Sequence, residues 1–103
     1  MKDIIQRKIA ELAEICNKRR VLRLALFGSA TGDDFNPASS DLDFIVEFQP
    51  VPPAEHADNY FGLLEDLERL FAMPVDLVER RPIRNPYFLK AVEETQVVLY
   101  VAA

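Results

Sequence analysis

The sequence predicts an α+β domain, with a small mixed β-sheet and helices packed largely on one face. Apolar runs of strand length alternate with segments of helical periodicity, and clusters of turn-forming residues separate them. The chain has 103 residues, half of them hydrophobic, which suits one small core. In chain order the segments read helix, strand, strand, helix, strand, helix, strand. We therefore expect a single domain spanning residues 1–103.

The first two segments are a helix and a strand. Between residues 2 and 18 the apolar positions recur at three- and four-residue spacing, which predicts one amphipathic helix with Ile5, Ile9, Leu12 and Cys16 on its apolar face. Residues 21–27 form a nearly continuous apolar run, interrupted by Arg23 and ended by Gly28. This strand would deliver Ser29 to a turn.

A polar loop leads to the second strand. Glycine, aspartate, asparagine and proline concentrate in residues 32–37, and these residue types favour turns. Residues 41–48 then resume a strand pattern with two distinct faces. The apolar face holds Leu42, Phe44, Val46 and Phe48. The second face holds Asp41, Asp43, Ile45 and Glu47.

The second half of the chain alternates helices and strands. Three prolines end the second strand because proline donates no ladder hydrogen bond, and we expect a loop from there through Asp58. The apolar positions of residues 60–71 give the strongest helical periodicity in the chain. Residues 74–78 predict a short strand, residues 85–94 a helix with proline in its first turn, and residues 97–101 a final strand.

Composition narrows the possible functions. The net charge of −5 argues against a general nucleic-acid binder, which needs a cationic surface. The lone Cys16 cannot form an internal disulfide, and no apolar run approaches transmembrane length. Charged residues near the N-terminus leave no apolar block of the kind found in a secretion signal. We expect a cytoplasmic protein without membrane contact.

Two short motifs carry the chemistry. Asp41 and Asp43 project from the same face of a strand, where two carboxylates can hold a divalent metal. Gly28 permits a close approach of the backbone, so that the turn beginning at Ser29 can meet phosphate oxygens. In isolation, the acids could be solvated strand-edge residues and the glycine an ordinary strand end. The only histidine, His56, is not expected to act as a general base.

The combination resembles the catalytic signature of nucleotidyltransferases in the DNA polymerase β superfamily. In that signature Gly-Ser and an Asp-x-Asp pair lie about a dozen residues apart, as do Gly28-Ser29 and Ser40-Asp41-Leu42-Asp43. The chain is most similar to the minimal nucleotidyltransferases of bacteria and archaea. The segment Pro74-Val75-Asp76 resembles their third-carboxylate strand, and Arg84-Asn85-Pro86 the start of their closing helix. The resemblance implies a polymerase β-like fold over nearly the whole chain.

The resemblance also implies an activity. Members of this type transfer AMP from ATP to a hydroxyl with the help of Mg²⁺, for which the resemblance implies two ions, and commonly pair with a HEPN-domain toxin. The implied acceptor is a tyrosine of that toxin, and the implied role is that of an antitoxin. The residues implied to be catalytic and to bind metal are Asp41, Asp43 and Asp76. Those implied to bind the nucleotide are Gly28, Ser29 and Ser40.

One departure from the family pattern keeps two other functions open. The family usually places an arginine between Gly-Ser and the next glycine, whereas this chain reads Gly28-Ser29-Ala30-Thr31-Gly32. A non-catalytic antitoxin that covers its partner's active site, or a nucleotide-binding regulatory module, would not need that cation. The exposed edges of so small a sheet also lead us to expect a homo-oligomer or a complex with another protein.

Overall fold

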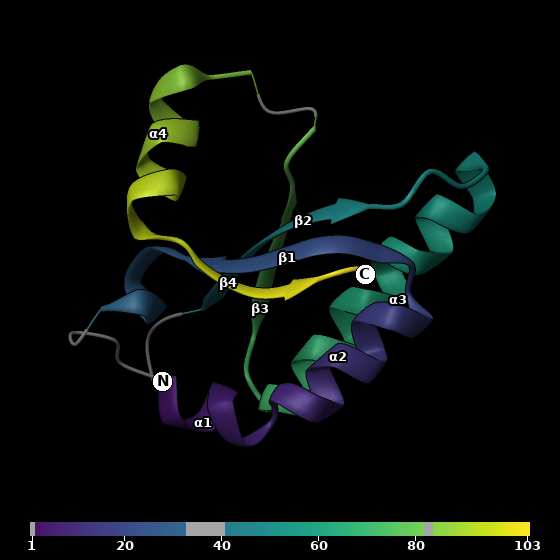
Figure 1. The fold of residues 1–103 in the computed structure, drawn as a ribbon, viewed down its shortest axis with the longest axis horizontal. Coiled ribbons are helices and arrows are strands. Elements are labelled where there is room, and N and C mark those ends of the chain that lie inside the picture. The colour runs from purple at the N-terminus through teal and green to yellow at the C-terminus, as the bar shows by residue number, and fades with distance from the viewer. Residues whose placement is uncertain (1, 33–40, 82–83) are drawn as a thin grey trace.

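The computed structural model describes residues 2–32, 41–81 and 84–103 (Figure 1). In these ranges the strands are β1 (Val21–Phe27), β2 (Leu42–Phe48), β3 (Val75–Glu79) and β4 (Val97–Val101). The helices are α1 (Lys2–Arg7), α2 (Ile9–Lys18), α3 (Pro53–Phe71) and α4 (Pro86–Thr95), with a short 3₁₀ turn, η1, over Gly28–Thr31. The order of the elements agrees with the predicted order.

The described strands form one four-stranded sheet in the order β3-β2-β1-β4. β1 runs antiparallel to both of its neighbours, β2 and β4, whereas β2 and β3 run parallel. The parallel pair is joined through α3, the crossover that a parallel connection requires. The mixed sheet is therefore confirmed. β3 and β4 lie at the two edges of the sheet.

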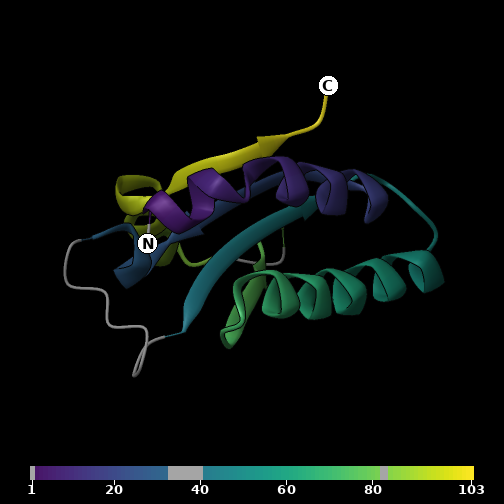
Figure 2. The same ribbon diagram turned by 90° about the horizontal axis from the view of Figure 1, so that it is seen from below.

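Most of the helical mass lies on one face of the sheet. Figure 2 shows α1 with α2 as one part of this layer and α3 as the other. Their buried side chains meet the apolar face of β2 in one core, which includes Leu12, Cys16, Phe44, Leu63 and Leu67. α4 packs on the opposite face, where its Val92 meets Ala25 and Ile45. The predicted division of β2 into two faces is confirmed.

The N-terminal helical segment is interrupted, which corrects the expectation of one continuous helix. Lys8 adopts a non-helical conformation, with φ −109° and ψ 10°, between α1 and α2. Its ammonium group donates a 2.6 Å hydrogen bond to the carbonyl of Leu70 at the end of α3. Ile5 is buried as predicted, but the break turns Ile9 outward and leaves it 37% exposed. Ile9 is therefore not a core residue.

The third helix begins earlier than predicted. The expected loop through Asp58 is wrong, because α3 starts at Pro53. Proline is well suited to the first helical turn, where its missing N–H would have no intrahelical partner. The run of prolines thus ends β2 and also starts α3. His56 consequently lies on a helix rather than in a loop.

The other predicted elements lie close to their expected positions. β1 and β4 have the predicted bounds, and the side chain of Asn85 caps α4 by accepting hydrogen bonds from the amides of Tyr87 and Phe88. The greater part of the predicted loop, together with Ser40, falls outside the described residues. No helix in the part of the chain that the structure describes is long and apolar enough to cross a membrane.

Candidate active site

Asp43 and Asp76 occupy equivalent positions on the parallel strands β2 and β3. The two residues are direct register partners. Their neighbours Phe44 and Leu77 are buried in the main core, and side chains alternate along a strand. Both carboxylates therefore project from the opposite face, on strands that lie about 4.8 Å apart. Asp41 immediately precedes β2 and lies at the same end of the sheet.

The environment of Asp43 disfavours its charged form. Partial burial raises the pKa of its carboxyl group, and the negative charges of Asp76 and then of Asp41 raise it further. Asp76 and Asp41 thus both lie close enough to Asp43 to disfavour its negative charge. Such a group of like charges is stabilised when a cation lies among them.

Within the described residues, no positively charged side chain forms an ion pair with Asp43 or Asp76. The ion pairs found there involve other acids: Asp66 with Arg19 and Arg69, Glu79 with His56, and Glu47 with Arg80. Asp43 and Asp76 make none of these contacts. Their mutual repulsion is therefore available to favour the binding of a cation from solution.

The donor chemistry fits Mg²⁺, although the ligands do not form a complete cage. In the described ranges, no three His, Cys, Asp or Glu side chains converge as a ready set of metal ligands. Mg²⁺ does not require such a set, because it usually keeps several waters and takes one or two carboxylates together with substrate phosphates. The two aligned carboxylates of Asp43 and Asp76 meet that requirement.

The turn at Gly28 lies directly against Asp43. Gly28 follows β1 with φ +74°, a left-handed conformation that glycine adopts readily. A Cβ atom on Gly28 would lie 2.7 Å from Oδ2 of Asp43. The preceding residue, Phe27, is the register partner of Asp43. The predicted phosphate-binding turn and the predicted metal-binding strand are therefore in contact.

α4 supports this turn from the side. The backbone amide of Gly28 donates a long, 3.5 Å hydrogen bond to Oγ1 of Thr95, the last residue of α4. The Thr31 hydroxyl donates a 2.7 Å bond back to the Gly28 carbonyl. Sequence reasoning missed Thr95, because a threonine at a helix end carries no signal of the turn that it contacts.

The structure describes two of the predicted nucleotide-binding residues in part or not at all. Ser29 lies within η1, and the structure describes its backbone alone. Ser40 falls outside the described residues. Of the predicted site, the structure thus brings Gly28, Asp43 and Asp76 together, with Asp41 beside them.

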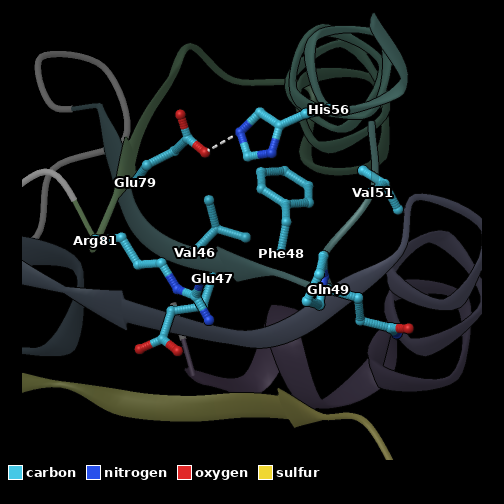
Figure 3. Close-up of a pocket in the computed structure, with 9 residues that line it drawn as sticks. Val46, Glu47, Phe48, Gln49, Val51, His56, Glu79 and Arg81 are labelled. Carbon is cyan, nitrogen blue, oxygen red and sulfur yellow. Dashed lines mark hydrogen bonds and ion pairs between the residues drawn. The ribbon is translucent and has the colours of Figure 1, made fainter. Parts of the chain in front are cut away.

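A separate pocket of about 380 Å³ lies toward the other end of β2 and β3. Figure 3 shows His56 and Glu79 facing each other across it, joined by a 2.5 Å contact between Nε2 and Oε1. Glu79 is three residues beyond Asp76 on β3, so its side chain projects from the face of the sheet opposite to that of Asp76. His56 is therefore remote from the carboxylate site.

The comparisons with known proteins agree with this geometry. Residues 9–99 match the model of the nucleotidyltransferase domain family. The chain belongs to that family and is a nucleotidyltransferase. A protein of Methanocaldococcus jannaschii named as a putative protein adenylyltransferase is 38% identical, over 76% of each chain.

Solved structures share the fold at lower identity. One described as a minimal nucleotidyltransferase aligns with a TM-score of 0.68 at 23% identity and covers 92% of both chains. Another is a tri-AMPylated HEPN toxin of Shewanella oneidensis in complex with its MNT antitoxin. It aligns with a TM-score of 0.63 at 17% identity, over 94% of this chain and 72% of the other. These likenesses confirm the predicted minimal nucleotidyltransferase fold.

Proposed function

We propose that this protein is a Mg²⁺-dependent adenylyltransferase that transfers AMP from ATP to a tyrosine hydroxyl of a HEPN-domain toxin and so acts as its antitoxin. The observation that carries the proposal is the contact between the Gly28 turn and Asp43, whose register partner is Asp76. A phosphate held on that turn would lie beside two carboxylates that favour a cation.

Each residue of the site has a distinct role in this proposal. Asp43 and Asp76, with Asp41, would hold Mg²⁺, which offsets negative charge on the reacting phosphate when it is bound. Gly28 leaves room for the triphosphate to approach the backbone beside Asp43. Asp76 would accept the proton of the acceptor hydroxyl while the oxygen of that hydroxyl bonds to the α-phosphorus of ATP. The bond to pyrophosphate then breaks, and pyrophosphate leaves.

A protein acceptor is favoured by the relatives. The Methanocaldococcus jannaschii relative is named for protein adenylylation, and the Shewanella oneidensis structure pairs an AMP-modified toxin with an antitoxin of the same fold. The described residues form the sheet that carries the candidate site and the helices packed on it. In this proposal the surface of the partner protein presents the acceptor hydroxyl to the site.

A non-catalytic antitoxin is the second candidate, and the composition of the turn favours it. Ala30 and Thr31 stand where the family usually provides an arginine, and neither side chain can supply a positive charge. Ala30 is buried, and the Thr31 hydroxyl is bonded to the Gly28 carbonyl. Neutralisation of the toxin by binding alone would not require that charge.

Intact-mass analysis of a co-expressed HEPN toxin tests the proposal. We expect ATP and Mg²⁺ to add one or more AMP units to the toxin, and Asp43→Asn and Asp76→Asn to abolish the gain. Glu79→Gln is the matched control, because it removes a carboxylate from the same strand on the other face. A stable complex that protects cells from the toxin without any mass gain would favour the non-catalytic candidate.

A further inference from the structure

β4 is an exposed apolar edge of the sheet. It pairs only with β1 among the described strands, so its outer side carries backbone groups without a strand partner. Three of its five side chains are exposed hydrophobic residues: Val97 at 38%, Val98 at 43% and Val101 at 60%. An apolar strand with a free edge is a template for pairing with another strand.

The opposite edge of the sheet is protected in a way that β4 is not. β3 carries Asp76 and Glu79 among its five residues, and Arg80 follows at once. Charged side chains on an edge strand oppose pairing with a further strand. The stretch from Thr95 to Ala103, which contains β4, carries no charged side chain. The two edges of this sheet therefore differ in their capacity for association.

A hollow beneath β4 would receive a side chain from an added strand. It measures about 220 Å³ and is lined by Ile5, Gln6, Leu26, Val97 and Leu99. α1 provides its floor, and β1 and β4 provide its roof. The register shift of β4 against β1 contributes, because it leaves both Leu99 and Tyr100 packed on the core. Apolar surface thus continues from the strand edge toward the helix layer.

We propose that the β4 edge is a dimer interface, occupied by β4 of a second copy of this chain in antiparallel, two-fold symmetric pairing. Such pairing would join two sheets into one and set apolar side chains opposite one another, an arrangement that stabilises antiparallel strands. One apolar side chain from each copy would enter the other's hollow.

Charge favours a second copy at this edge over other arrangements of two copies. Each chain carries a net charge of −5, so two copies repel each other where acidic surfaces face. The β4 edge lets them approach through a segment without charged side chains. The same segment is rich in the β-branched and aromatic residues that pair well across strands.

The proposed dimer leaves both candidate active sites open. Asp43 and Asp76 lie on β2 and β3, which would form the two outer ends of the joined sheet. Five-residue strands bury little surface, so we expect weak, concentration-dependent association. This inference does not depend on the proposed function, and each can fail without the other.

Sedimentation velocity over a range of protein concentrations tests the interface. We expect a monomer–dimer equilibrium in the unmodified chain and a dissociation constant at least about tenfold higher in Val98→Lys, because each copy would then carry a charged side chain on the apolar edge. Phe61→Lys is the matched control, since Phe61 is 63% exposed on α3, away from the edge. Circular dichroism would verify that both variants are folded.

Disulfide trapping gives a second, independent reading. Cys16 is the only native cysteine and is completely buried, so a cysteine introduced at Val97, Val98 or Val101 is the accessible thiol. Facing residues in antiparallel strands lie within disulfide range, and we expect at least one of these variants to form a covalent dimer on mild oxidation. Phe61→Cys should not.

Three outcomes would overturn the dimer. The first is a monomer at every concentration. The second is a dimer that Val98→Lys does not weaken or that only Phe61→Cys can trap. The third is a monomeric chain whose binding to a HEPN toxin is lost in Val98→Lys, which would assign the edge to that partner instead.

Discussion

Gly28 and Asp43 are in direct contact at the junction of a turn and a strand. The Cα atom of Gly28 lies so close to the aspartate that a methyl group on it would come within 2.7 Å of Oδ2. Gly28 also has φ +74°, which other residues adopt only with strain. The contact joins the turn proposed to hold phosphates to a carboxylate proposed to hold metal. It leaves no room for a side chain between them.

The first prediction concerns this contact. We expect Gly28→Ala to abolish adenylyl transfer and to lower the free energy of unfolding by about 1–2 kcal/mol, the usual cost of a left-handed conformation for a residue with a Cβ. Urea denaturation measures the stability, and intact-mass analysis of the acceptor measures the transfer. Full transfer by Gly28→Ala would show that the turn does not touch the substrate.

A double mutant separates the clash from the backbone strain. Asp43→Ala removes the carboxylate that the new methyl group would meet. We therefore expect Gly28→Ala combined with Asp43→Ala to be less destabilised than the sum of the two single changes. Strictly additive changes in the free energy of unfolding would mean that the methyl group is accommodated without displacing Asp43.

The second prediction follows from the raised pKa of Asp43. Burial, then Asp76, then Asp41 raise the pKa of this carboxyl in the folded state above its ordinary value of 3.8. The folded state therefore holds the proton more tightly than the unfolded state does. The resulting contribution to stability is fully present below the unfolded pKa and is lost as the pH rises through the folded pKa.

Asp43→Asn should consequently be more stable than the unmodified chain at neutral pH without metal. The difference should shrink as the pH falls and disappear below the ordinary pKa of aspartate. Urea denaturation in the presence of a chelator, repeated across acidic and neutral pH, measures it. Asp66→Asn is the contrasting control. Asp66 forms an ion pair with Arg19 at 2.8 Å, and loss of this pair should destabilise the protein.

The third prediction is that Mg²⁺ stabilises the folded chain through these carboxylates. A ligand that binds only the folded state raises its stability by mass action. We expect saturating Mg²⁺ to raise the melting temperature by about 4 °C or more, which for a domain of this size corresponds to ~1 kcal/mol. Calorimetry or fluorescence-monitored melting provides the measurement.

Variants locate the cation. Asp43→Asn and Asp76→Asn should lose most of the Mg²⁺-dependent rise, whereas Glu79→Gln should keep it, because Glu79 is engaged with His56 on the other face of the sheet. A rise that persists in both aspartate variants would place the cation elsewhere on the protein. No rise in the unmodified chain would mean that metal binding requires the nucleotide phosphates.

The elements that carry the site could be predicted because their signals are local. Alternation along residues 42–48 separates a buried face from an acidic one, and Gly28 ends a strand of apolar residues. The register of Asp43 with Asp76 could not be predicted from periodicity, because it depends on which strands pair. The family resemblance implies only that Asp76 belongs to the same metal site as Asp41 and Asp43.

Features that depend on distant contacts were missed. The break at Lys8 coincides with a hydrogen bond to Leu70, sixty-two positions further along the chain. The contact of Thr95 with the Gly28 amide likewise spans sixty-seven positions. The early start of α3 has a local signal, proline in a first helical turn, but the same prolines also break a strand, and the sequence pattern alone favours a loop there.

The fourth prediction concerns the support of β3. The hydroxyl of Tyr60 on α3 donates a 2.6 Å hydrogen bond to the carbonyl of Leu77, the residue after Asp76. Burial, followed by the negative charges of Glu79 and Asp76, raises the pKa of Tyr60, so the phenol keeps the proton that it donates. This bond ties the strand that carries Asp76 to the helix layer.

We expect Tyr60→Phe to lower the free energy of unfolding by about 1 kcal/mol, the typical net contribution of one hydrogen bond. Tyr87→Phe is the matched control: Tyr87 is 84% exposed, and its loss of a hydroxyl should change stability by less than about 0.5 kcal/mol.

The contribution of the Tyr60 hydrogen bond should also depend on pH. The stability that the protonated phenol of Tyr60 provides is present below the unfolded pKa of tyrosine and is lost as the pH rises through the raised folded pKa. The difference between Tyr60→Phe and the unmodified chain should therefore narrow in strongly alkaline solution. Equal effects of the two tyrosine variants in urea denaturation at neutral pH would mean that the Leu77 carbonyl finds another donor and that β3 is held by packing alone.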